Sequence, residues 1–256
     1  GIRIDEFRDG DGARLRKKYD IPESALVVGH LGRLAHEKNL GFLTRAVLKF
    51  VQSNDDAHFL VVGSGDARES IIRIFREAGC PERLHMTGTL EGQDLVDAYH
   101  AMDLFAFASK SETQGMVLAE AMSASLPVVA LDAPGAREVV DDGRNGRLLD
   151  SEDAEVFARA LSEIAALEGD ARDSLFKEID RTAREFSLEN TARRTLDLYE
   201  DVLERGPAPA RELEDSVWNQ AVGFFKAQWD LLVNVATSAG EAISEGDDQT
   251  KSSSEQ

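Results

Sequence analysis

The chain has 256 residues and a net charge of -19, from 29 Lys and Arg against 48 Asp and Glu, which is enough length for one large domain with appendages. A chain this acidic repels nucleic-acid phosphates and anionic membranes, so we expect no nucleic-acid partner. The single cysteine excludes an internal disulfide, the five histidines show no metal-ligand spacing, and no apolar run reaches the roughly 18–20 residues of a membrane span.

The chain begins with Gly1, and residues 1–7 have the composition of a linker that leaves something upstream. We therefore expect the natural protein to be longer, with this chain as its C-terminal part. An amphipathic segment follows at residues 13–19.

Residues 26–149 then alternate between short apolar runs and helical patterns. The expected strands are 26–31, 58–62, 84–87, 104–108, 128–130 and 147–149, and the expected helices are 40–51, 68–78, 93–101, 116–124 and 136–140. Strands this apolar, separated by helices, predict an α/β fold: a doubly wound, Rossmann-like parallel sheet with helices on both faces. In such sheets ligands bind beyond the carboxyl ends of the strands.

From residue 153 onward the pattern is helical, with helices expected at 154–167, 171–185 and 188–204. We expect the Rossmann-like domain to span residues 1–204 and to be followed by a linker at 205–210. An amphipathic helix at 211–240 carries both tryptophans, Trp218 and Trp229, on an apolar stripe. Its polar face is acidic, which favours a protein surface over a lipid one as its partner. Residues 241–256 form an acidic tail without apolar anchors, and we expect it to be disordered.

The stretch after the fourth expected strand combines two carboxylates with a helix start. Glu112 lies in the loop and Glu120 about one turn into the helix, with Gly115 between them. The amides of Met116 and Val117 would be unpaired donors at the helix N-terminus, which attracts anions. This pattern suits a ligand that carries both phosphate and hydroxyls, such as a nucleotide-sugar. The alternative is that both carboxylates are solvated charges on an ordinary helix start.

Two cations follow the first core strand. Arg33 and Lys38 stand just before a helix that Asn39 can cap. In a chain of net charge -19 they favour an anionic ligand such as a diphosphate. The alternative is that they pair with Glu37 and neighbouring acids.

The second and third strands end in glycine turns, at Gly63-Ser-Gly65 and at Thr87-Gly88. Glycine at Gly63 permits a tight turn and close approach of a ring or phosphate. The G-x-G-x-x-G fingerprint and the acidic residue that a dinucleotide ribose requires are both missing, which disfavours a dehydrogenase. No Ser–His–Asp, Cys–His or metal-binding constellation accompanies these loops.

Taken together, five motifs resemble those of the family 4 glycosyltransferases and occur in that family's order. They are Gly32-Arg33-Leu-x-x-Glu37-Lys38-Asn39, Val61-Val-Gly63-Ser-Gly65, Glu112-Thr-Gln-Gly-Met-Val-Leu-Ala-Glu120-Ala-Met, Pro127-Val-Val-Ala130 and Gly143-x-Asn-Gly146. The resemblance covers residues 1–204 and implies the GT-B fold, in which two Rossmann-like domains face each other across a cleft. It implies that this chain is the C-terminal, donor-binding half, and that an N-terminal acceptor domain precedes Gly1.

The resemblance also implies residue roles. It assigns Arg33 and Lys38 to the donor diphosphate and Glu112, with the backbone near Gly115 and Met116, to the sugar hydroxyls. Arg33, Lys38 and Glu112 are the expected catalytic residues. Glu120 would bind the ribose hydroxyls. The full donor-binding set is Gly32, Gly63, Thr87, Gly88, Thr113, Gly115, Met116, Val117 and Glu120.

The implied activity is transfer of a hexose from a UDP- or GDP-sugar with retention of configuration, without a metal or any cofactor besides the substrate. The chain alone would bind the donor but transfer poorly. The motif Glu-Thr-Gln-Gly is similar to that of bacterial transferases that glucosylate diacylglycerol, so we expect a UDP-sugar and a lipid or saccharide acceptor. We expect a cytoplasmic protein that can lie at the inner face of the membrane. The alternative is a nucleotide-sugar-binding or regulatory module without turnover.

One position departs from the family pattern. Ser125 stands where the family usually has Gly in Ala-Met-x-x-Gly-x-Pro. If the backbone there needs a positive φ, Ser strains it by about 1 kcal/mol.

Overall fold

The computed structural model describes residues 1–112 and 114–205. The strands are β1 (Leu26–Leu31), β2 (Ala57–Val62), β3 (Leu84–Gly88), β4 (Leu104–Phe107), β5 (Val128–Leu131) and β6 (Gly146–Leu149). The helices are α1 (Ile4–Arg8), α2 (Gly12–Lys18), α3 (Leu40–Ser53), α4 (Arg68–Glu77), α5 (Gly92–His100), α6 (Met116–Ser123), α7 (Pro134–Arg137), α8 (Ala154–Ala165), α9 (Gly169–Glu185) and α10 (Leu188–Arg205). Two 3-10 turns, η1 (His36–Lys38) and η2 (Pro81–Arg83), complete the described elements.

The six strands form one parallel sheet in the order β3-β2-β1-β4-β5-β6. The chain leaves β1 in one direction for β2 and β3, then returns to the other side of β1 for β4, β5 and β6. The strand order therefore reverses between β1 and β4. At such a reversal the loops after the two strands diverge to opposite faces of the sheet and leave a crevice beyond their carboxyl ends. This confirms the expected doubly wound fold.

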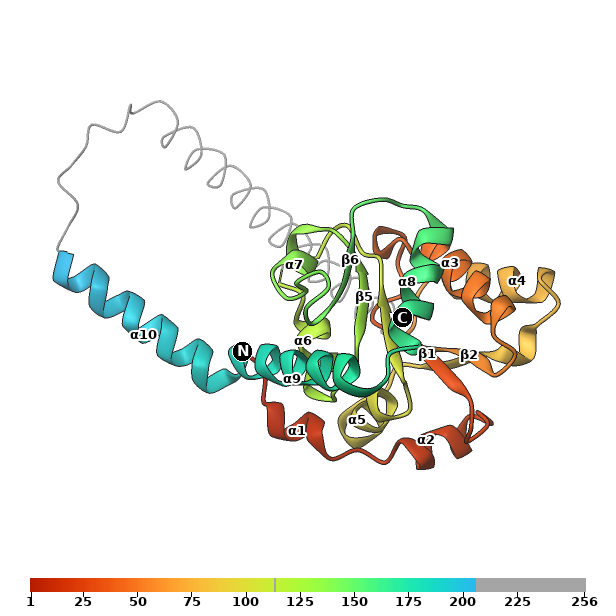
Figure 1. The fold of residues 1–256 in the computed structure, drawn as a ribbon, viewed down its shortest axis with the longest axis horizontal. Helices are drawn as coiled ribbons and strands as arrows, with labels where there is room; N and C mark the ends of the chain where they lie inside the picture. Colours follow the sequence, from red (N-terminus) through yellow and green to blue (C-terminus); the bar gives the residue numbers. More distant parts are fainter. Residues whose placement is uncertain (113, 206–256) are drawn as a thin grey trace, which may run out of the picture. The chain divides into compact units, whose positions relative to one another are not determined.

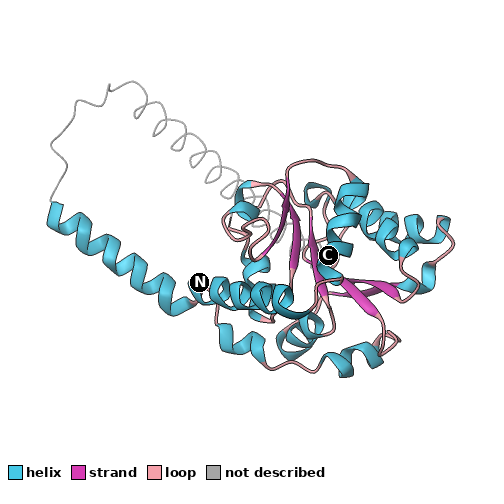
Figure 2. Ribbon diagram, in the orientation of Figure 1, coloured by secondary structure: helices cyan, strands magenta, loops and turns pink. Residues whose placement is uncertain are grey.

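Helices cover both faces of the sheet (Figures 1 and 2). One layer contains α3, α4 and α8, and the other contains α1, α2, α5, α6 and α9. Because both faces are covered, β4 and β5 are buried at every position, which explains their uninterrupted apolar sequences Leu-Phe-Ala-Phe and Val-Val-Ala-Leu. Each large side chain buried there, such as Phe105 or Phe107, adds about 1.5–3 kcal/mol of hydrophobic stabilisation.

The N-terminal residues are more ordered than their linker-like composition indicated. Residues Ile4–Arg8 form α1, and the ring of Phe7 packs edge-on against that of Tyr99 at 5.7 Å. The Ile2 amide donates to the Phe186 carbonyl at 2.9 Å, and the Leu188 amide donates to the Ile2 carbonyl at 2.8 Å. The apolar side chains at Ile2 and Phe7 explain why this segment docks on the domain.

The chain divides into two compact units, Gly1–Leu196 and Asp197–Gln256. The whole sheet belongs to the first unit. In the second, the described residues are the last turns of α10, which ends at Arg205, one residue into the predicted linker. The rest of that linker, the amphipathic helix predicted at 211–240 and the acidic tail at 241–256 lie outside the described residues, so they stay predictions.

Two glycines meet where the loop after β4 turns into α6. Gly115 is the N-cap of α6 with φ 62°, and a Cβ on it would lie 2.3 Å from the carbonyl oxygen of Gly135 in α7. The Gly135 amide in turn donates to the Glu112 carbonyl at 3.0 Å. Both the positive φ and the close approach require glycine at Gly115, and the contact fixes the backbone that carries Glu112.

The other end of α6 closes through Ser125. Its φ is 61°, its amide donates to the Met122 carbonyl, and the Leu126 amide donates to the Ala121 carbonyl, both at 2.9 Å. This pair of bonds is the Schellman motif, whose left-handed position favours glycine. The positive φ that we considered from the sequence is therefore present, and a serine occupies it.

We predict that Gly115→Ala lowers the free energy of unfolding by about 2–4 kcal/mol, because it adds a backbone clash to the left-handed strain. Gly143→Ala is the matched control: Gly143 has φ 73°, and its Cβ would meet nothing within 4 Å. The control should lose only the strain, about 1 kcal/mol. Urea unfolding of both variants measures the difference. Equal losses would show that the Gly115–Gly135 contact does not restrict the loop.

We predict that Ser125→Gly raises the free energy of unfolding by about 0.5–1 kcal/mol. Relief of the left-handed strain exceeds the greater flexibility of glycine in the unfolded chain. The Ser125 side chain is exposed, so its removal costs little packing. The urea midpoint should increase at unchanged slope, and a lower midpoint would contradict the prediction.

Candidate functional site

The reversal of strand order brings together residues that are far apart in the sequence. Lys38 lies in the loop after β1 and Glu112 in the loop after β4, and their Nζ and Oε2 atoms are 3.0 Å apart. Their side chains are only 19% and 20% exposed, so the ion pair is partly shielded from water. Two of the three predicted catalytic residues thus meet at the edge of the sheet where ligands of this fold class bind.

The third predicted catalytic residue, Arg33, lies in the same loop but points into solvent. Its Nη2 atom is 2.6 Å from Glu37 Oε1, and 72% of its side chain is exposed. Arg33 therefore pairs with Glu37, which is the alternative interpretation that the sequence left open. An ion pair this exposed contributes about 1 kcal/mol at most, so it opposes a move of Arg33 toward an anion only weakly.

The start of α6 lies between the two predicted carboxylates. The helix begins at Met116, and the amides of Met116 and Val117 belong to its first turn, where amides have no intrahelical acceptor. Both side chains are half-buried against the core. The helix N-terminus therefore presents donors and a positive dipole end beside Glu112.

Glu120 lies farther along α6 and is half-buried. Burial raises the pKa of its carboxyl, and the hydrogen bond from the Tyr99 hydroxyl, 2.8 Å from Glu120 Oε2, partly offsets this by favouring the charged form. Glu120 is thus held by a neighbour that the sequence pattern did not single out.

The glycine turns after β1 and β2 line a cleft of about 250 Å³ that includes Gly32, Arg33 and Gly63. A Cβ on Gly63 would lie 1.9 Å from the Gly32 carbonyl oxygen, so only glycine fits there. Thr87 and Gly88 are not among its lining residues. The Gly88 carbonyl instead accepts from the Gly63 amide at 2.8 Å and so helps to hold the backbone of Gly63 in place.

Six residues that line this cleft were not among the predicted site residues. They are Leu31, Val62, Ser64, Thr89, Leu90 and Leu95. The hydroxyl oxygens of Ser64 and Thr89 are 2.9 Å apart and join the loops after β2 and β3. Their position one residue beyond Gly63 and Gly88 was the only signal in the sequence. Thr113, the remaining predicted donor-binding residue, lies outside the described residues.

A histidine lies buried in the sheet next to these loops. The Nδ1 atom of His30, in β1, is 3.1 Å from the Ala106 carbonyl oxygen, which it meets as a donor, and burial lowers the pKa of His30 to about 4. The nearby charge of Lys38 lowers that pKa further. His30 is therefore neutral at pH 7 and adds no positive charge beside Arg33 and Lys38.

The prediction that Asn39 caps α3 is wrong. Asn39 occupies the N-cap position with φ 54°, but its side chain makes no capping bond. Its Nδ2 atom donates instead to Glu152 Oε1 at 2.7 Å. The left-handed backbone turns the amide away from the first turn of the helix and toward the loop after β6.

Within residues 1–112 and 114–205, no group of three or more His, Cys, Asp or Glu side chains is arranged to hold a metal ion. The expectation that no metal is needed stays a prediction. In the same part of the chain, no helix combines the length and the apolarity that crossing a membrane requires.

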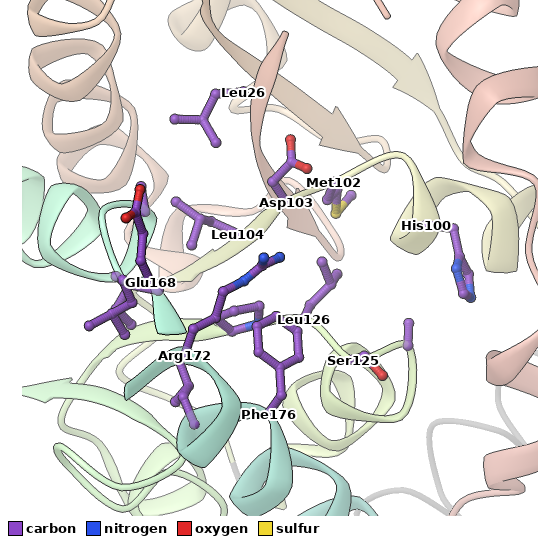
Figure 3. A pocket seen from close by; sticks show the side chains of 16 residues that line it. Leu26, His100, Met102, Asp103, Leu104, Ser125, Leu126, Glu168, Arg172 and Phe176 are labelled. Atoms are coloured by element: carbon purple, nitrogen blue, oxygen red, sulfur yellow. The ribbon is translucent and has the colours of Figure 1, made fainter. Parts of the chain in front are cut away.

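A second cavity, of about 490 Å³, lies at the opposite edge of the sheet, by the first residues of β1 and β4 (Figure 3). None of the predicted site residues lines it. Its charged side chains include Arg172, whose guanidinium lies 5.2 Å from the centre of the Phe176 ring. Because it lies at the amino ends of the strands, we assign the candidate site to the smaller cleft and the crevice beside it.

The described residues offer a cation paired with a carboxylate, a helix start beside them that can bind an anion, and a second carboxylate farther along that helix. The cations and amides suit phosphate oxygens, and the carboxylates suit hydroxyl groups. A ligand with both kinds of group satisfies the whole set.

Solved structures share the fold. The C-terminal domain of the group 1 family glycosyl transferase LpcC from Francisella tularensis aligns with a TM-score of 0.64 at 19% identity, covering 73% of this chain and 100% of that domain. Anabaena Alr3699/HepE in complex with UDP-glucose aligns with a TM-score of 0.67 at 23% identity, covering 79% of this chain and 56% of its own. At these identities the likeness concerns the fold alone.

Curated relatives are closer in sequence. D-inositol 3-phosphate glycosyltransferase of Corynebacterium kroppenstedtii is 30% identical over 217 residues, which are 81% of this chain and 48% of that protein. Sulfoquinovosyl transferase SQD2 of Arabidopsis thaliana is 37% identical over 134 residues, 52% of this chain and 24% of that protein. The chain spans about half the length of the inositol 3-phosphate glycosyltransferases that it matches. The model of the family Glycosyl transferases group 1 matches residues 11–183, and the chain therefore belongs to that family.

Proposed function

We propose that this chain is the donor-binding half of a hexosyltransferase that uses a nucleoside-diphosphate sugar, with a UDP-sugar favoured. The observation that carries the proposal is the contact of Lys38 with Glu112 beside the start of α6, at the reversal of strand order. Membership of the Glycosyl transferases group 1 family supports it. We further propose that an N-terminal domain supplies the acceptor side of the cleft and that transfer retains the anomeric configuration.

In this proposal the ion pair is a resting state of the site. When the donor binds, Lys38 exchanges the Glu112 carboxylate for a diphosphate oxygen, and Glu112 turns to the sugar hydroxyls. Each group replaces one charge-assisted hydrogen bond with another, so the exchange costs little. Arg33 leaves its exposed pair with Glu37 to reach the same diphosphate.

The base then occupies the cleft at Gly32 and Gly63, and the ribose hydroxyls bind Glu120. Solved complexes of Anabaena Alr3699/HepE with UDP and with UDP-glucose make uridine the first base to test. Ser64 and Thr89 add hydroxyls at the rim of the cleft.

The chemical contribution is electrostatic. As the bond between the sugar and the diphosphate breaks and the sugar passes to the acceptor, negative charge develops on the diphosphate. Arg33, Lys38 and the amides of α6 stabilise that charge without a metal ion. Preorganised charges of this kind are a major source of catalysis.

For the acceptor we propose a lipid or a saccharide, with a UDP-hexose as donor. The name of one relative indicates an inositol phosphate and that of another indicates a sulfoquinovosyl group, so the names do not point to a single substrate. We propose a cytoplasmic location, with attachment to the inner face of the membrane if the acceptor is a lipid. A second candidate function is a binding or regulatory module without turnover. The chain covers only about half the length of the relatives that it matches, so the activity test below also includes this second candidate.

We predict that Lys38→Ala weakens binding of UDP by about 1.5–3 kcal/mol, the usual contribution of a hydrogen bond to a charged group. Titration calorimetry with UDP and with GDP measures the change. Lys49→Ala is the matched control, because Lys49 lies in α3 and pairs with Glu155 on the covering helix layer. Unchanged affinity in Lys38→Ala would remove Lys38 from the diphosphate site.

We predict that the chain, co-expressed with its N-terminal half, releases UDP or GDP from a nucleotide-sugar in the presence of acceptor, and that the chain alone binds the donor with little release. A coupled assay for the released nucleotide measures both. A pair that binds donors but releases nucleotide from none of the common ones would favour the regulatory module.

A further inference from the structure

Tyr99 is fully buried in α5, and its hydroxyl is the one polar group on a ring that is otherwise enclosed by core residues. The ring packs edge-on against Phe7 at 5.7 Å and lies 6.0 Å from Phe105 in β4. These contacts come from two other elements, α1 and β4, and restrict the motion of the ring. The position of the hydroxyl is therefore set by the core.

That hydroxyl donates to Glu120 Oε2 at 2.8 Å. The two residues belong to neighbouring helices, α5 and α6, and lie 21 positions apart in the sequence. Within the described residues, this is the one hydrogen bond that the Glu120 side chain makes. One carboxylate oxygen is thus held by the Tyr99 hydroxyl, and the remaining lone pairs accept no other hydrogen bond from the described residues.

Without this bond, a half-buried carboxylate could change in two ways that would weaken its binding of a ligand. It could rotate about its terminal torsion, which is broad and roughly two-fold, and it could take up a proton. The fixed phenol restricts the rotation by holding Oε2. It opposes protonation because it donates a hydrogen bond to the charged form of the carboxylate.

We propose that Tyr99 is a positioning residue that holds the carboxylate of Glu120 in the orientation that binds the ribose hydroxyls of the nucleotide. This inference rests on the proposed function, which places the ribose at Glu120. Tyr99 touches no ligand itself. It acts through Glu120, to which it donates from the neighbouring helix α5.

The test is the binding of UDP, 2′-deoxy-UDP and 3′-deoxy-UDP to the full 256-residue chain by titration calorimetry, in wild type and in Tyr99→Phe. We expect the wild type to bind UDP about tenfold or more tightly than at least one deoxy analogue. Tyr99→Phe keeps the ring and removes only the hydroxyl. It should weaken UDP binding about three- to tenfold while leaving the deoxy analogue nearly unchanged, so the preference for the ribose hydroxyl narrows.

Two further measurements separate positioning from a general loss of structure. In a Glu120→Ala background, which removes the carboxyl group altogether, adding Tyr99→Phe should change UDP affinity by less than twofold, because a residue that acts through the Glu120 side chain has nothing left to act on. The pH profile gives the second measurement. Burial and the Tyr99 bond are the two influences on the pKa of Glu120, and removal of the bond leaves burial unopposed. The acid limb of UDP binding should therefore move to higher pH in Tyr99→Phe.

Tyr19→Phe is the matched control, because it removes the same atom from a tyrosine at the C-cap of α2, whose ring lies 5.6 Å from Lys18 Nζ and does not line the cleft. It should leave UDP affinity, the deoxy preference and the acid limb unchanged. Circular dichroism checks that each variant is folded.

The outcomes are distinguishable. If wild type binds no UDP, or binds UDP and both deoxy analogues equally, the assignment of the ribose to Glu120 fails and this inference fails with it. If wild type discriminates and Tyr99→Phe discriminates equally well with an unmoved acid limb, the proposed function stands and the positioning role of Tyr99 is overturned. A further loss of affinity on adding Tyr99→Phe to Glu120→Ala would also overturn it.

Discussion

The reversal of strand order between β1 and β4 is the constraint on which the rest of the site depends. Parallel strands send their loops out at one edge, and adjacent loops normally cover each other. At the reversal they part, and residues that leave β1 and β4 meet across the gap without a helix to separate them. The ion pair of Lys38 with Glu112 exists because of that topology.

The pair is poorly suited to a purely structural role. It is partly desolvated, so its attraction is set against the cost of removing both charges from water. Replacing it with apolar side chains would be the simpler way to stabilise that edge. What the pair does provide is a cation and an anion that are partly shielded from water. In the proposed function, Lys38 exchanges the Glu112 carboxylate for a diphosphate oxygen of the same charge, and Glu112 exchanges Lys38 for a neutral sugar hydroxyl that donates to it.

Most strands and helices could be predicted from the sequence. The strands were recognisable because buried parallel strands are short, uniformly apolar runs, and both ends of β1 were predicted correctly. The site was predictable to the extent that it sits in loops after strands. Tyr99 and the cleft residue Leu95 were not predictable, because a tyrosine or leucine on an amphipathic helix has the same pattern whether it fills the core or supports a site. Asn39 shows the opposite failure: its residue type favoured a cap, but its left-handed backbone directs the side chain elsewhere.

The two ends of the sheet-bearing unit leave the domain at a single place. Ile2 accepts from Leu188 and donates to Phe186, so the chain enters beside the point where it passes from α9 into α10. A segment joined to either side of this pairing would therefore leave the unit at the same place. The same closeness makes the unit suited to circular permutation, because a short bridge from residue 196 back to Gly1 would leave the sheet undisturbed.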